Sequence, residues 1–259
     1  MTNTREIRDF YNKISMNSQS TEMWGDFLVE IRESILIKNI ETFKEWPPIR
    51  ATMNAGDPTT GFTRKHLDIL RAREDWASRW EPATKVEFTT NAVNHSFYLT
   101  KLEDTVKSID KVDFIFEFGA GFGNMCRLVK SLGFKGKYII FDFPELLAIQ
   151  KYYLSTYNIE ASDDLQSDVT LCCDMAKLQS MIQGKENALC ISNHALEEAP
   201  DSVMFEVLSY VKDFEMFLFA FSGGKDKFED FVAQNNIKHL NEEFPSMKGH
   251  YIIAGAKND

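Results

Sequence analysis

A glycine-rich segment in the middle of the chain has the residue types that hold a nucleotide-like ligand. Glu117 stands two residues before Gly119-Ala120-Gly121-Phe122-Gly123, with an apolar run before the segment and a helix-like pattern after it. Glycines at a strand-to-helix turn let a ligand approach the backbone and the N-terminus of the helix. The dinucleotide fingerprint G-x-G-x-x-G would need a glycine where this chain has Asn124. The spacing G-x-G-x-G therefore favours a different nucleotide-type cofactor, and the alternative is a tight turn without a ligand.

Acidic side chains stand at the ends of the next two apolar runs. Asp142 ends the run 137–142, and Asp174 follows the run 168–173. Open α/β sheets bind ligands beyond the carboxyl ends of their strands, so both side chains are expected at one edge of a sheet. A carboxylate there can accept hydrogen bonds from ribose hydroxyls. Each acid also has a structural alternative, because Asp is a favoured N-cap and a helix-like pattern follows both positions.

The elements that must position these residues alternate between two patterns from residue 112 onward. Near-continuous apolar runs, typical of parallel strands covered on both faces, are separated by amphipathic segments. The expected strands are 113–118, 137–142, 168–173, 187–193 and 214–221, and the expected helices are 123–132, 144–156, 175–182, 201–212 and 225–234. Two further strands, 236–241 and 249–255, are expected to be joined by a turn around Pro245–Gly249. The pattern predicts an α/β fold with a mostly parallel sheet.

The first 110 residues have helix-like periodicity and few strand-like runs. Helices are expected at 3–16, 22–44, 63–80 and 91–109, with a loop at 55–61. Trp46-Pro47-Pro48 is expected to end the second of these helices, because proline cannot continue a helix. We therefore divide the chain into a helical N-terminal region, 1–110, and an α/β domain, 111–259. The N-terminal region is expected to close over the ligand and to carry any contacts of a homo-oligomer.

Composition and charge exclude several classes of protein. The 259 residues are 44% hydrophobic and 26% charged, and the formal net charge is −10, which argues against a nucleic-acid-binding protein. The N-terminus has no signal-peptide core, and no window is long and apolar enough to span a membrane. The four cysteines form no C-x-x-C pair, so we expect small buried side chains in a reducing compartment. The expectation is a soluble cytoplasmic protein without nucleic-acid or membrane partners.

Three segments together resemble a known family. The segments FEFGAGFGNMCRLVK, YIIFDFPELLAIQKYYL and ISNHALEE are similar to the sugar O-methyltransferases of bacterial surface-polysaccharide gene clusters, which pair an E-x-G-x-G-x-G turn with a D-x-P-E segment and a later S-N-H-type element. The similarity covers residues 110–200, and the helical N-terminal region matches only in general character. Many members carry Ser-Leu-Ser-Glu after the histidine, whereas this chain has Ala195-Leu196-Glu197-Glu198, so its acceptor is expected to differ if those serines touch substrate.

The resemblance implies a Rossmann-like class I fold with an antiparallel C-terminal strand and the cofactor S-adenosyl-L-methionine (SAM). It implies methyl transfer to a hydroxyl of a saccharide or nucleotide-linked sugar in polysaccharide biosynthesis. The alternatives are an O- or N-methyltransferase of small metabolites and a catalytically silent subunit that binds a partner. In such enzymes the position of Asp174 contacts the adenine amino group, and Phe122 is expected to pack on the cofactor. The candidate cofactor residues are Glu117, Gly119, Ala120, Gly121, Phe122, Asp142, Phe143, Asp174, Met175, Ser192 and Asn193.

His194 is the first candidate for a catalytic base, because a sugar hydroxyl is a weak nucleophile and histidine titrates near neutral pH. Glu197, three positions later, would orient the imidazole or touch the acceptor; the alternative is that His194 caps the next segment and fills the strand end. His95 is the second candidate, with a surface or capping role as its alternative. Some sugar methyltransferases use magnesium, but here only His194, Glu197 and Glu198 cluster in the sequence, and no metal is predicted.

Overall fold

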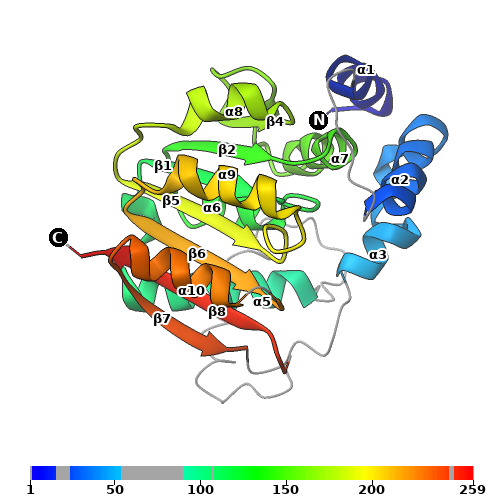
Figure 1. Cartoon of the computed structure of the whole chain (residues 1–259). Coiled ribbons are helices and arrows are strands. Elements are labelled where there is room, and N and C mark those ends of the chain that lie inside the picture. Colours follow the sequence, from blue (N-terminus) through cyan, green and yellow to red (C-terminus); the bar gives the residue numbers. More distant parts are fainter. Residues whose placement is uncertain are drawn as a thin grey trace.

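The computed structural model describes residues 2–15, 24–53, 90–106, 108–223, 225–244 and 248–258, and these form an α/β fold around one mixed sheet (Figure 1). The strand order is β3-β4-β2-β1-β5-β6-β8-β7, and every neighbouring pair is parallel except those of β8, which is antiparallel to both β6 and β7. The strands are β1 (Phe114–Phe118), β2 (Lys137–Phe141), β3 (Ala161–Ser162), β4 (Val169–Cys172), β5 (Ala188–Asn193), β6 (Met216–Phe221), β7 (Ile237–Glu243) and β8 (Tyr251–Lys257). The predicted fold class and its antiparallel C-terminal strand are confirmed.

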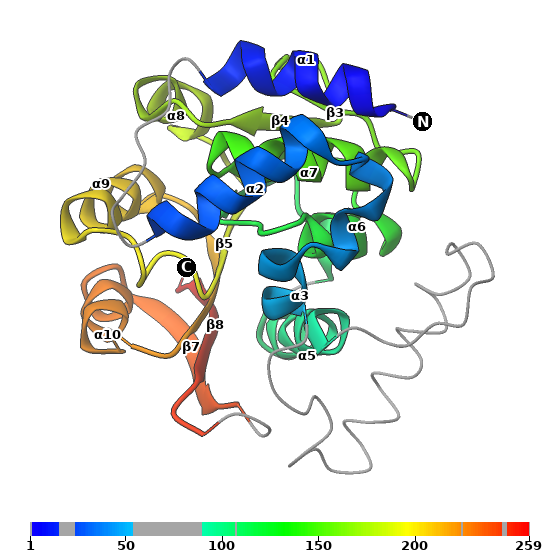
Figure 2. The same cartoon turned by 90° about the vertical axis from the view of Figure 1, so that its right-hand side faces the viewer.

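Helices cover both faces of the sheet, which is why its central strands are apolar along their whole length. In Figures 1 and 2, α5, α6 and α7 lie on one face and α8, α9 and α10 on the other. Each face has its own cluster of buried apolar side chains. The helices are α5 (Thr90–Thr105), α6 (Asn124–Ser131), α7 (Pro144–Ser155), α8 (Met175–Ile182), α9 (Asp201–Val211) and α10 (Lys225–Gln234), with a 3₁₀ turn, η4 (Ile109–Lys111), before β1.

The N-terminal helices differ from the expectation mainly between residues 38 and 53. The helix predicted at 22–44 is interrupted: α2 (Gly25–Ile37) ends at Lys38, and Asn39 caps a 3₁₀ helix, η3 (Ile40–Glu45). Trp46-Pro47-Pro48 follows η3 and at once begins another helix, α3 (Pro47–Met53), because proline is tolerated at the first helical position, where its missing N–H has no partner to lose. The predicted loop 55–61 and helix 63–80 lie outside the described residues.

Helices α1 (Thr4–Ile14) and α2 dock on α7 through apolar contacts and one buried carboxylate. Glu145 of α7 has a side chain that is 2% exposed, and its Oε1 accepts hydrogen bonds from Arg32 Nη2 at 2.7 Å and from the Tyr11 hydroxyl at 3.1 Å. A buried carboxylate with two donors is held in one place. Because α7 begins directly after β2, this contact fixes the N-terminal helices beside the carboxyl edge of the sheet. None of the described helices is long and apolar enough to cross a lipid bilayer.

We expect Arg32→Ala to lower the free energy of unfolding by about 1–3 kcal/mol, because Glu145 stays buried and loses its charged donor. Urea unfolding of the full chain measures the change. Arg5→Ala is the matched control, since Arg5 is exposed and lies 4.0 Å from an exposed Asp9; its effect should be near zero. Equal stabilities of the two variants would contradict the role of Arg32 in docking.

Candidate functional site

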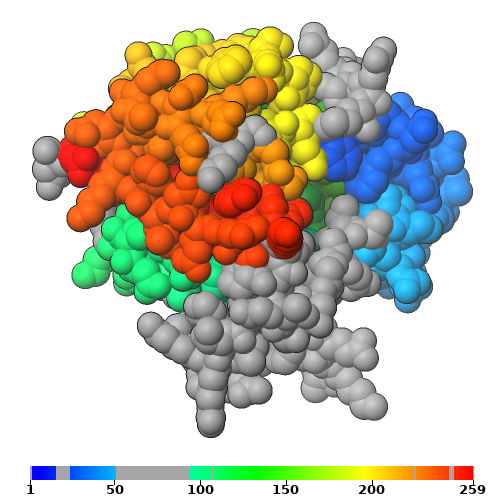
Figure 3. Space-filling view, turned by 60° about the horizontal axis from the view of Figure 1, so that its bottom comes forward, coloured from blue at the N-terminus to red at the C-terminus, as the bar shows by residue number. Residues whose placement is uncertain are grey.

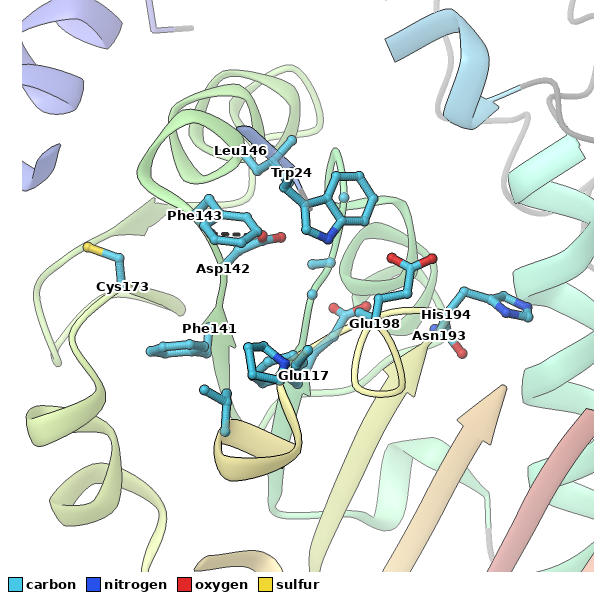
Figure 4. A pocket seen from close by; sticks show the side chains of 18 of the residues that line it. Trp24, Glu117, Phe141, Asp142, Phe143, Leu146, Cys173, Asn193, His194 and Glu198 are labelled. Carbon is cyan, nitrogen blue, oxygen red and sulfur yellow. Dashed lines mark hydrogen bonds between the residues drawn. The ribbon is translucent and has the colours of Figure 1, made fainter. Parts of the chain in front are cut away.

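A cavity of about 830 Å³ opens at the carboxyl ends of the central strands. Its walls come from the segments that follow β1, β2, β4 and β5, from α5, and from Trp24 at the start of α2. Figure 4 shows Asp142 and Phe143 on one side of the cavity and His194 on the other, with Glu198 between them. In the space-filling view the blue surface of α2 lies beside the yellow surface of the segment after β5 (Figure 3). The sequence-predicted residues Glu117, Asp142, Asp174, His95 and His194 therefore share one cavity.

The turn between β1 and α6 has three glycines with positive φ: Gly119 at 72°, Gly121 at 58° and Gly123 at 96°. A Cβ on Gly119 would lie 2.1 Å from the Cβ of Ala195, so this position has room only for glycine. A Cβ on Gly121 would meet no described atom within 4 Å. Gly121 therefore leaves open space beside the backbone on the cavity side, as a ligand-binding turn requires.

Glu117, the last acid before this turn, is fully buried and lines the cavity. Its Oε2 accepts a hydrogen bond of 2.7 Å from the Tyr138 hydroxyl, and its Oε1 has no partner. Burial raises the pKa of Glu117 to about 8, so the carboxyl group is largely protonated at neutral pH. A positively charged group that enters the cavity would favour its ionised form.

Asp142 follows β2, and its two oxygens accept hydrogen bonds of 2.8 Å from the Phe143 N–H and from Gln150 Nε2. Burial raises the pKa of Asp142 to about 7, although these two hydrogen bonds act to lower it. Gln150 also donates to the Gly121 carbonyl at 2.9 Å, which ties the end of β2 to the glycine turn. The N-cap of α7 is Phe143, without a side-chain bond, so the cap alternative for Asp142 does not hold. Its remaining lone pairs are available to hydroxyl donors.

Asp174 has the N-cap role that the sequence offered as its structural alternative. It is the N-cap of α8, where its Oδ1 accepts from the Ala176 N–H at 3.0 Å, and it also lines the cavity beside Met175. The further sequence-predicted residues that line the cavity are Gly119, Ala120, Phe143 and Asn193.

Three sequence-predicted residues, Phe122, Ser192 and Glu197, lie outside the cavity lining; Glu197 contacts His194 Nδ1 but does not itself line the cavity. Phe122 is 3% exposed and points into the layer under the N-terminal helices, where its ring packs on Tyr153 at a centroid distance of 5.1 Å. The expected packing of Phe122 on a cofactor is therefore corrected: the turn directs this side chain into the core. Ser192 is 1% exposed, and its hydroxyl accepts from the Leu196 N–H at 3.0 Å, so it shapes the loop after β5.

His194 is held at the end of β5 in a left-handed backbone conformation with φ of 55°. Its N–H donates to the Ala220 carbonyl of β6 at 2.7 Å. Its Nδ1 lies 3.4 Å from Glu197 Oε1, and Nε2 lies 3.2 Å from the Tyr98 hydroxyl. Glu197 only accepts, so it favours the neutral tautomer of His194 in which Nδ1 carries the proton and Nε2 presents a lone pair. Burial raises the pKa of Tyr98, which keeps its hydroxyl a donor to Nε2.

The sequence-based site missed several lining residues, among them Tyr98, His250, Trp24 and Glu198. Tyr98 stands three positions after His95 on α5, and this helical spacing was an available signal. His250, just before β8, brings its ring within 5.0 Å of the His194 ring, and Trp24 reaches the cavity from α2; nothing in the sequence pairs either with the motif. Glu198 has one unpartnered oxygen, and burial with the nearby Glu197 raises its pKa to about 7. The described residues contain no group of three His, Cys, Asp or Glu that could hold a metal ion.

No protein-family model matches the chain, and no curated protein matches its sequence. Several solved structures resemble it. The Mg-protoporphyrin IX methyltransferase of Synechocystis with bound SAM is 12% identical over 77% of this chain and 100% of that chain, with a TM-score of 0.47. An rRNA methylase of Streptococcus thermophilus is 15% identical over 65% and 96%, with a TM-score of 0.47. Fibrillarin of Aeropyrum pernix with natively bound SAM is 10% identical over 61% and 73%, with a TM-score of 0.44. Likenesses at this level say nothing about the substrate of this chain.

We expect Glu117→Gln to become more stabilising, relative to the wild type, as the pH rises from about 5.5 to about 8. The folded pKa of Glu117 lies above its unfolded value, so the wild type loses stability over this window while the amide does not titrate. Urea unfolding of the ligand-free chain at both pH values measures the difference. Glu33→Gln, at an exposed position of α2, should show no such trend. A pH-independent difference for Glu117→Gln would contradict the raised pKa.

Proposed function

We propose that the chain is a SAM-dependent methyltransferase that acts on a hydroxyl of a saccharide. The observation that carries the proposal is one cavity that joins a buried acidic cofactor half, with Glu117 and Asp142, to a polar acceptor half with His194.

The cofactor half fits the chemistry of SAM. SAM carries positive charge on its sulfonium and ammonium groups. Such a charge favours the ionised form of buried Glu117, whose Oε1 has no partner and can then accept a hydrogen bond from the ammonium group. Asp142 has lone pairs for the two ribose hydroxyls. Phe143, Leu146 and Met175 give this side of the cavity apolar surface suited to a purine ring.

Bound SAM would supply a methyl group that passes to the acceptor oxygen as the carbon–sulfur bond breaks and a carbon–oxygen bond forms. His194 Nε2 takes the proton of the acceptor hydroxyl, whose oxygen becomes the nucleophile. Glu197 holds the Nδ1 side and stabilises the imidazolium that results. The Tyr98 contact of 3.2 Å is at the long end of hydrogen bonds, so an acceptor hydroxyl can replace it at Nε2.

Unpartnered amide groups in the acceptor half support a hydroxyl-rich substrate. Asn94 Oδ1 and both amide atoms of Asn193 are buried without a hydrogen bond, and both residues line the cavity. Buried polar atoms are normally paired, so a ligand with several hydroxyl groups would satisfy them. A second candidate is methyl transfer to an amine, which the carboxyl group of Glu198 favours, because its unpartnered oxygen could bind an ammonium group.

The cofactor is tested by Asp142→Ala, which should weaken SAM binding about tenfold or more, because two ribose hydroxyls lose a buried charged acceptor. Isothermal calorimetry measures the affinity, and circular dichroism confirms folding. Asp9→Ala, at an exposed position of α1, should bind as the wild type does. Wild-type affinity in folded Asp142→Ala would remove this residue from the site. A wild type that does not bind SAM would defeat the proposal as a whole.

The transfer step is tested by His194→Asn, since asparagine tolerates the left-handed backbone and has no base. On a panel of methyl hexopyranosides, kcat should fall about 10²–10⁴-fold with SAM affinity unchanged, and the ascending limb of the pH profile should be lost. His239→Ala, on the edge strand β7, is the matched control and should keep its kcat. Unchanged kcat in His194→Asn would exclude His194 as the base, and turnover of amines alone would favour the second candidate.

A further inference from the structure

The side-chain amide of Asn124, the first residue of α6, can take only one orientation. Its oxygen faces the guanidinium of Arg127, with contacts of 3.2 Å to Nε and 2.9 Å to Nη2. A guanidinium group only donates, so the atom that faces it must be the oxygen of the amide. The Tyr153 hydroxyl donates to the same oxygen at 3.3 Å. Asn124 is 1% exposed and Arg127 is 4% exposed, so water does not compete for these bonds.

This orientation fixes the proton of His95. The amide nitrogen of Asn124 lies 3.1 Å from His95 Nδ1, and an amide NH₂ group only donates. Nδ1 must therefore accept, so the neutral ring carries its proton on Nε2. A protonated ring would place an N–H against the amide N–H. Burial, the nearby His194 ring and the charge of Arg127 act in the same direction and lower the pKa of His95 to about 3.

His95 and His194, two of the three histidines that line the cavity, therefore present opposite groups. Glu197 on the Nδ1 side of His194 leaves a lone pair at Nε2, whereas Asn124 on the Nδ1 side of His95 leaves an N–H at Nε2. Tyr98 packs near both rings, with centroid distances of 6.1 Å to His95 and 6.4 Å to His194. The pair can receive a ligand that donates a hydrogen bond at one ring and accepts one at the other.

We propose that His95 is a fixed neutral Nε2–H donor that binds an oxygen of the acceptor next to the hydroxyl that His194 deprotonates, with Asn124 and Arg127 as positioning residues. The inference rests on the proposed methyl transfer at this site. It narrows the acceptor to a polyol or saccharide that carries a second oxygen near the reacting hydroxyl. It also gives His95 a role other than that of a second base, because a ring without an available lone pair on the cavity side takes no proton there.

The tautomer is tested without any substrate. In ¹⁵N NMR spectra of the full chain, with His95 assigned by comparison with His95→Gln, we expect a neutral Nε2–H ring that does not titrate between about pH 5 and 8. Asn124→Asp replaces the donor by an acceptor, so Nδ1 should gain a proton and His95 should titrate in this range. Asn12→Asp, at an exposed position of α1, makes the same charge change and should leave His95 as it is. A wild-type His95 that titrates in this range or carries its proton on Nδ1 would overturn the inference.

The donor role is tested on whichever methyl hexopyranoside of the panel the wild type methylates. In the wild type, the deoxy analogue that lacks the second oxygen should have a KM about tenfold higher than the parent sugar. In His95→Phe the parent sugar and the analogue should have the same KM. His95→Gln, which keeps an N–H donor, should restore part of the difference in KM between the parent sugar and the analogue. The pH profile of His95→Phe should keep its ascending limb. A rise in KM of equal size in the wild type and in His95→Phe would overturn the donor role. Loss of the ascending limb of the pH profile in His95→Phe would also overturn it. Failure of SAM to bind would defeat the proposed function and leave the tautomer result standing.

Discussion

Burial of carboxyl groups at the carboxyl ends of β1 and β2 is the constraint on which the cavity depends. Glu117 and Asp142 end apolar strands in the middle of the sheet, where their charged forms lose the solvation of water. The donors around them compensate only in part, since both pKa values remain raised. This burial carries an electrostatic cost that a cationic ligand with hydroxyl donors would relieve. Binding of such a ligand to the folded chain would therefore stabilise it.

The two halves of the cavity are built in different ways, and this difference explains their properties. Consecutive βα units supply the cofactor half: each parallel strand delivers one side chain to the same edge, and Gln150 ties the second unit to the first. Segments that are distant in the sequence supply the acceptor half. His95 and Tyr98 come from α5, His194 from the loop after β5, and His250 from the segment just before β8. The acceptor half thus depends on how α5 and β8 pack together, and a few substitutions there can change the acceptor while the cofactor half stays as it is.

The same difference decides what the sequence could predict. The helices after residue 112 and all the strands except the two-residue β3 were predictable, because their apolar runs and turns are local signals. The position of Glu117, Asp142 and Asp174 at one edge of the sheet was predictable because parallel strands end at the same edge. Phe122 was assigned wrongly, because the direction of a side chain within a left-handed turn is set by the backbone and not by its neighbours in sequence. The break after α2 was missed because the apolar spacing continues through Asn39. His250 and Trp24 carry no local signal, since only tertiary packing places them in the cavity.

The roles of the two histidines follow from the partners of their Nδ1 atoms and not from the histidines themselves. An imidazole near neutral pH can donate or accept at Nε2, and the group on its other nitrogen decides which. Glu197 is local to His194, three residues along the same loop, so that assignment can be made from sequence. Asn124 reaches His95 from another helix, and its own orientation is set by Arg127 one turn further along α6. Asn124 is also the residue that breaks the dinucleotide fingerprint. The departure from G-x-G-x-x-G that argued against a dinucleotide thus places, at the same position, the amide that fixes the proton of His95 in the acceptor half.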